Sequence, residues 1–111
     1  MKQFCLACDL KDDAEKIKAY DAYHRNVWPD IKASLITAGI LDMEIYRTGN
    51  RLFMIIQTAD DFSFEHKAAL DLANPIVQEW EELMSVYQNQ IPWAKPGVKW
   101  LLMERVFKLK S

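Results

Sequence analysis

Apolar and polar residues follow patterns that divide the chain into elements. Residues 3–10 form a short apolar run bounded by a charged cluster, which indicates a strand that gives way to a helix. Apolar residues then recur at spacings of three and four over 13–38, the pattern of one face of a helix. Pro29 predicts a kink or a restart within it, because proline disfavours helical backbone in the residue before it. Gly39 is a helix-stop glycine.

A β-hairpin is the clearest local signal. Two strand-like runs, 41–48 and 51–58, are joined by Gly49-Asn50. A two-residue turn of this composition between apolar runs is typical of a hairpin.

The rest of the chain supplies one more helix and one more strand. A helical stretch over 63–87 is interrupted near Pro75, and 100–109 is a closing strand after a loop. The order is therefore strand, helix, strand, strand, helix, strand. With right-handed crossovers this order predicts an α+β fold of the ferredoxin-like kind, a βαββαβ sandwich with both helices on one face of four antiparallel strands. The length of 111 residues predicts one domain over 1–111.

Such a fold leaves the second face of the sheet uncovered. Aromatic residues on that face, such as Phe53 or Phe107, are expected to be buried, either by a second copy of the chain or by a ligand pocket built above the sheet. We therefore expect a homodimer with a pocket in each protomer.

Composition and charge exclude several classes of partner. Half of the residues are hydrophobic and 27% are charged, an ordinary globular composition. The net charge of −2 comes from interspersed charges of both signs, so no basic face for nucleic acid is expected. No segment approaches the roughly 20 apolar residues of a membrane span, and the N-terminus does not resemble a signal peptide. The expected location is the cytoplasm, away from membranes.

Cys5 and Cys8 form a CxxC string, which in other contexts marks a redox pair or half of a zinc site. Here both lie inside a strand-like run, where residues three apart face opposite sides of the strand. A closed zinc site would also need more ligands than His24 and His66 can add. We interpret both cysteines as buried, reduced thiols and expect no metal.

Tyr20, His24 and Trp28 are spaced four apart and are expected to form one row along a helix. Sugar rings stack on aromatic planes, while a phenol and an imidazole supply polar contacts, so the row suits the wall of a sugar site. The alternative is that all three belong to the core between helix and sheet, which is the commoner role of aromatic residues at helical spacing.

An ordered set of motifs along the chain resembles the L-rhamnose mutarotase family, with an ending closer to its L-fucose branch. The motifs are Tyr20-x-x-x-His24-x-x-x-Trp28-Pro29-Asp30, Gly39, Ile45-Tyr46, Asn50-Arg51-Leu52-Phe53, Gln78-Glu79-Trp80, Ala94-Lys95-Pro96-Gly97, Trp100 and Met103-Glu104-x-Val106-Phe107.

This resemblance implies a ferredoxin-like homodimer with a barrel-like core and no metal or organic cofactor. It implies an isomerase that interconverts the α and β anomers of a small monosaccharide, a 6-deoxy-L-hexose such as L-fucose or L-rhamnose. The proton-donating histidine of the family falls on His24, and a sugar-contacting tyrosine falls on Tyr20. A paired-tryptophan element falls on Trp80 and Glu81, so a carboxylate replaces the second indole. A second sugar-contacting tyrosine falls on Met43, and this departure also bears on which sugar is bound.

Mutarotation needs proton transfers at two sugar oxygens. A group with a pKa near 6.5 serves in either direction around neutral pH, which favours His24 as the catalytic residue. Candidates for the second proton-transfer group are Glu81, Asp42, Tyr46 or water. Glu81 can equally be interpreted as part of a solvated helix face. Trp28, Tyr46 and Trp80 are further candidates for sugar contacts.

Two other functions fit the same fold. One is a small dimeric monooxygenase-like enzyme that uses no separate cofactor, and the other is a non-catalytic ligand-binding dimer in which the aromatic row is core. The ordered motifs favour the mutarotase. Among other residues, His66 is interpreted as a surface residue, Arg25 as an exposed charge within possible reach of a sugar, and Trp93 and Trp100 mainly as core packing.

Overall fold

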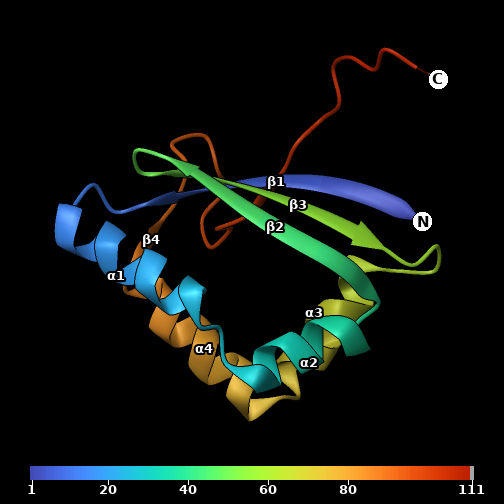
Figure 1. Cartoon of the computed structure of the whole chain (residues 1–111), viewed down its shortest axis with the longest axis horizontal. Helices are drawn as coiled ribbons and strands as arrows, with labels where there is room; N and C mark the ends of the chain where they lie inside the picture. The colour runs from blue at the N-terminus through green and yellow to red at the C-terminus, as the bar shows by residue number, and fades with distance from the viewer. Residues whose placement is uncertain (111) are drawn as a thin grey trace.

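The chain folds into an antiparallel sheet whose one face is covered by helices, while the other face carries none (Figure 1). The computed structural model describes residues 1–110. Its elements in chain order are β1 (Lys2–Leu10), α1 (Ala14–Arg25), α2 (Pro29–Thr37), β2 (Ile40–Thr48), β3 (Arg51–Thr58), α3 (Phe64–Leu72), α4 (Pro75–Ser85), β4 (Gln88–Asn89) and β5 (Leu101–Leu102). The strand order β2-β3-β1-β4, with β5 also paired to β1, is the predicted ferredoxin-like arrangement.

Both long helical patterns are divided at a proline, as predicted. The Asp13 carboxylate caps α1, and the Asn74 side chain caps α4 directly before Pro75. Trp28 has extended backbone (φ −56°, ψ 135°) because Pro29 follows it, so α2 begins as a new helix. None of the helices within residues 1–110 is long and apolar enough to cross a membrane.

The hairpin of β2 and β3 sets which side chains face the helices. It turns at Gly49, whose φ of +55° is a conformation that glycine adopts without strain. The strand pairing places Arg47 opposite Leu52, and Leu52 opposite Cys8, so these three side chains share the helix-covered face. On each strand, the residues directly before and after these three therefore point to the open face.

The core lies between this face and the helices, in two clusters. The larger is made by Cys8, Leu10, Tyr20, Ile31, Leu52, Val77, Trp80 and Met84. The smaller is made by Leu6, Ile40, Ile56 and Phe62. Trp100 packs against both clusters, which confirms core packing for that residue, whereas Trp93 is 71% exposed.

The predicted closing strand over 100–109 is wrong beyond Leu102. The backbone N–H of Met103 donates to the carbonyl oxygen of Cys5 at 2.7 Å, and the chain then leaves the sheet and extends away from the molecule (Figure 1). Val106 is 94% exposed and Phe107 75% exposed. The short strand β4, which the sequence pattern did not predict, pairs with the same edge of β1 at Asp9 and Leu10. In a single protomer the apolar residues of the C-terminal segment therefore have no surface to pack on.

The two cysteines occupy opposite faces of β1, as the strand assignment requires. Both are free thiols. Cys8 is fully buried, and burial, reinforced by the charge of Asp9, raises the pKa of its thiol to about 12. Cys5 is only half-buried on the open face, so the prediction of two buried thiols is correct for Cys8 alone.

Candidate active site

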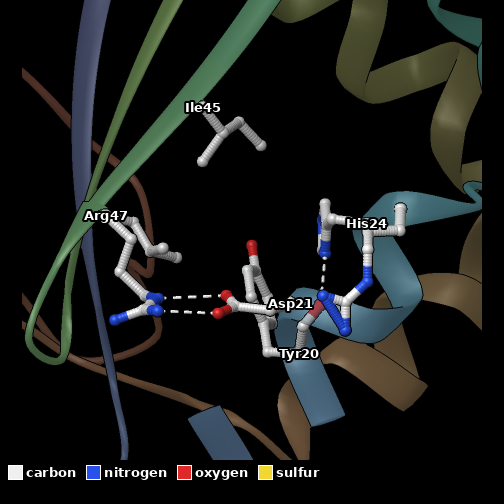
Figure 2. Close-up of a pocket in the computed structure, with 7 residues that line it drawn as sticks. Tyr20, Asp21, His24, Ile45 and Arg47 are labelled. Atoms are coloured by element: carbon white, nitrogen blue, oxygen red, sulfur yellow. Dashed lines mark hydrogen bonds and ion pairs between the residues drawn. The ribbon is translucent and has the colours of Figure 1, made fainter. Parts of the chain in front are cut away.

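A cavity of about 310 Å³ lies between α1 and the β2–β3 hairpin, on the helix-covered face of the sheet (Figure 2). One wall is formed by side chains of α1 that lie in two neighbouring rows, with residues four positions apart within each row. The other wall is formed by side chains at alternating positions of the hairpin strands. Its volume falls at the lower end of the range of about 300–1,000 Å³ common for small-molecule sites. The lining residues are Tyr20, Asp21, His24, Arg25, Ile45, Arg47 and Leu52.

The hydrogen bond of His24 determines which nitrogen of the ring carries its proton. Nδ1 lies 2.9 Å from the carbonyl oxygen of Tyr20, one helical turn earlier. A carbonyl oxygen only accepts, so Nδ1 carries the hydrogen and, in the neutral ring, Nε2 keeps a free lone pair. Burial lowers the pKa of His24 below its usual value, against the smaller opposing effects of this hydrogen bond and of Asp21. The imidazole is therefore neutral at pH 7, with Nε2 available as a proton acceptor.

Aromatic rings hold the imidazole in place. The ring of Tyr20 stacks on that of His24 with centroids 4.1 Å apart, and Trp80 meets it edge-on at 5.6 Å. Trp28 packs against Trp80 with centroids 4.9 Å apart. The predicted single row of Tyr20, His24 and Trp28 is wrong at Trp28, because α1 ends at Arg25 and Trp28 precedes the next helix. Trp28 and Trp80 belong to the core, and neither is a lining residue of the cavity.

Tyr20 is almost fully buried, with 3% of its surface exposed, although it lines the cavity. Burial raises the pKa of its phenol, while a hydrogen bond with the side chain of Gln88 acts in the opposite direction. The hydroxyl is therefore protonated at neutral pH. The predicted pair of Tyr20 and His24 is brought together in one cavity.

An ion pair at the opposite end of the cavity was not anticipated from the sequence. Arg47 Nε donates to Asp21 Oδ1 at 3.0 Å, and its Nη2 donates to Oδ2 at 2.7 Å (Figure 2). Arg47 Nη1 also donates to the carbonyl oxygen of Gly49 at 2.8 Å. The sequence did contain one signal for a role of Arg47 in a site. Met43, Ile45 and Arg47 occupy alternating, inward-facing positions of one strand, and Arg47 is the charged residue among them.

The other predicted candidates lie away from this cavity. Met43 packs against the smaller core cluster. Tyr46 points to the open face, is 54% exposed and donates its hydroxyl to Glu44 Oε2 at 2.7 Å. Glu81 lies on the exposed side of α4, where partial burial and then the charge of Asp71 raise its pKa. Asp42 accepts a hydrogen bond from the backbone N–H of Met43 at 2.9 Å.

Two of the lesser candidates have clear positions. Arg25 lines the cavity, within reach of a bound molecule, while His66 is exposed, as predicted. Within residues 1–110 no group of three or more His, Cys, Asp or Glu side chains is arranged to hold a metal ion.

Comparison with known proteins places this chain in a family. A family model described as L-rhamnose mutarotase matches residues 3–109. The L-fucose mutarotase of Xanthomonas campestris pv. campestris is 42% identical over 113 residues, covering 100% of this chain and 90% of that protein. The L-rhamnose mutarotase of Phocaeicola vulgatus is 33% identical over 98 residues, covering 86% and 88%.

A solved structure shares the fold. The L-rhamnose mutarotase of Formosa agariphila superposes with a TM-score of 0.72 at 21% identity, covering 99% of this chain and 100% of that one. The match of the family model to residues 3–109 and the identity to the two curated mutarotases show that the chain belongs to the L-rhamnose mutarotase family.

Proposed function

We propose that this protein interconverts the α and β anomers of a 6-deoxy-L-hexose, with His24 as the catalytic residue. Membership of the mutarotase family gives the reaction class, sugar anomer interconversion by an isomerase. The observation that supports the role of His24 is its neutral imidazole, which lines a cavity of small-ligand size and keeps a lone pair on Nε2.

The proposed chemistry is reversible ring opening. Nε2 of His24 takes the proton of the anomeric hydroxyl, the bond between the anomeric carbon and the ring oxygen breaks, and the ring oxygen takes up a proton. Both oxygens are bonded to the same carbon, so the imidazolium formed in the first transfer can donate to the second oxygen. Rotation of the open-chain aldehyde and the reverse transfers then give the other anomer. General acid–base catalysis of this kind contributes about 10²- to 10⁴-fold.

The lining of the cavity fits the two-sided character of a 6-deoxy sugar. Asp21, Arg25 and Arg47 supply charged hydrogen-bonding groups, whereas Ile45 and Leu52 supply an apolar wall. A 6-deoxyhexose carries hydroxyl groups around its ring and one methyl group. Hydroxyl groups pair with the charged side chains, and the methyl group suits the apolar wall.

The test is to follow anomer exchange of L-fucose and of L-rhamnose by saturation-transfer NMR with catalytic amounts of the protein. The expected result is a rate proportional to protein concentration, with at least one of the two sugars accelerated. D-Arabinose, which is L-fucose without its methyl group, is expected to exchange more slowly. Absence of acceleration with every 6-deoxy sugar would contradict the proposed function.

We also propose that the protein works as a homodimer, with a second copy covering the open face of the sheet. One row across that face consists of Tyr46, Phe53, Ala7 and Leu101, which are adjacent in the strand register. The apolar C-terminal segment leaves the sheet beside this row, with Phe107 and Leu109 75% and 82% exposed. Exposed apolar surface of this kind marks an interaction site, and a second copy offers a matching open face and segment.

A further inference from the structure

We infer that the Asp21–Arg47 ion pair is the specificity-determining contact of the cavity, binding the sugar hydroxyls that His24 does not use. This inference rests on the proposed function. The two side chains come from different elements, α1 and β2, and line the same cavity as His24. Because the cavity is only about 310 Å³, we expect a sugar ring bound at His24 to lie close to the other lining residues as well.

The pair is held firmly but keeps unused hydrogen-bonding capacity. Arg47 has five N–H groups, of which two donate to Asp21 and one to Gly49. Within residues 1–110, each terminal nitrogen of Arg47 thus keeps one N–H without a protein acceptor. The Asp21 carboxylate accepts two hydrogen bonds from Arg47 and has lone pairs for more.

This arrangement matches a pair of neighbouring sugar hydroxyls. Each hydroxyl both donates and accepts, so one can donate to the carboxylate while the next accepts from the guanidinium. L-Fucose and L-rhamnose differ in the configuration of individual ring hydroxyls, and a fixed donor–acceptor pair distinguishes such positions strongly. A site built to hydrogen-bond a hydroxyl is left with unpaired polar groups when that hydroxyl points elsewhere.

The Asp21–Arg47 ion pair is expected to contribute little to the free energy of unfolding. About a third of each side chain is exposed, 33% for Arg47 and 35% for Asp21, and exposed ion pairs typically contribute about 0–1 kcal/mol, with bidentate arginine–carboxylate pairs at the upper end. A second bidentate pair provides a matched comparison on the opposite face of the sheet. There Arg51 donates to both carboxylate oxygens of Asp9, at 2.7 and 3.1 Å, and neither residue lines the cavity.

The experiment compares Arg47→Gln, Asp21→Asn and Arg51→Gln with the unmodified protein, measuring kcat and KM of anomer exchange for both sugars. Assays are run above pH 7, on the neutral side of the lowered pKa of His24, because Asp21 influences that pKa. For Arg47→Gln and Asp21→Asn we expect KM for the preferred sugar to rise about tenfold, as for loss of a charged hydrogen bond, with kcat within about threefold. We expect the ratio of kcat/KM between L-fucose and L-rhamnose to move toward one. Arg51→Gln should lower the melting temperature and leave KM and this ratio unchanged.

The outcomes separate the inference from the proposed function. An unmodified protein that accelerates no 6-deoxy sugar overturns both. An active protein whose Arg47→Gln and Asp21→Asn variants keep the original KM and sugar preference overturns the inference alone. The same holds if both sugars lose rate equally through kcat, because that pattern indicates a structural role.

Discussion

The imidazole of His24 lies over the phenol ring of Tyr20, with 27° between the two planes and 4.1 Å between their centroids. The residues are one turn apart on α1, and a hydrogen bond from Nδ1 to the Tyr20 carbonyl oxygen fixes the same orientation. The orientation of the His24 imidazole is therefore set by local helix geometry together with the packing of Trp80.

Replacement of His24 by alanine is expected to lower the rate of anomer exchange by about 10²- to 10⁴-fold, because the proton acceptor is lost. The fold should persist, since His24 contributes no cap and no ion pair to it. Saturation-transfer NMR measures the rate and circular dichroism the fold. An active, folded His24→Ala protein would show that another group transfers the proton.

Acid should inactivate the protein at a lower pH than that at which a free histidine titrates. The pKa of His24 is below 6.5 in the folded state because of burial, so at a given acidic pH a larger fraction of His24 is neutral than of a free histidine. We expect kcat/KM to fall with a midpoint below pH 6.5. Its value should agree with the pKa of His24 measured by NMR, and a midpoint above 6.5 would contradict the assignment.

The lowered pKa of His24 also makes the free energy of unfolding depend on pH. Between the folded and unfolded pKa values of His24 the unfolded chain binds more protons, so the free energy of unfolding rises with pH. This contribution is complete above pH 6.5 and is lost as the pH falls toward the folded pKa. The melting temperature of the wild type relative to that of His24→Gln should therefore fall on acidification.

Removal of the Tyr20 hydroxyl tests whether this buried group contacts the sugar. For Tyr20→Phe we expect KM to rise several-fold and stability to fall by about 1 kcal/mol, because the hydrogen bond with Gln88 is lost. Tyr23→Phe is the matched control, since Tyr23 packs on Trp80 from outside the cavity. Equal KM values for the two variants would exclude a sugar contact by Tyr20.

The two thiols should differ sharply in reactivity. Cys8 has no exposed surface and a pKa raised to about 12, so iodoacetamide should not modify it in the native protein. Cys5, half-buried on the open face, is the expected site of any native labelling. Mass spectrometry of Cys5→Ser and Cys8→Ser proteins identifies the modified residue, and native labelling at Cys8 would contradict its burial.

The C-terminal segment should control the oligomeric state. We expect light scattering to give a dimer for the full chain and a monomer for Phe107→Asp, because a charge at this position opposes burial by a second copy. Lys108→Ala, at the neighbouring exposed position, should remain dimeric. A full chain that stays monomeric at concentrations of tens of micromolar would refute the proposed homodimer.

Local signals in the sequence predicted most element boundaries because those signals act over a few residues. Pro29 and Pro75 divide the helices through backbone sterics alone, and Gly49 turns the hairpin because it adopts a positive φ. The pair of Tyr20 and His24 followed from a helical spacing of four. Trp28 was wrongly placed in that row. Pro29 imposes an extended backbone on the residue before it, which is Trp28, so Trp28 does not continue the helix.

The sequence by itself determined the order of the main elements apart from β4, the ferredoxin-like fold and the family, since each follows from patterns read along the chain. Only the tertiary structure decided that Asp21 meets Arg47, 26 positions away, and that the C-terminal segment leaves the sheet after Met103. Contacts between distant residues depend on how helices dock and on which strand occupies an edge. Those are properties of the packed molecule, set by volume and register, and no local pattern encodes them.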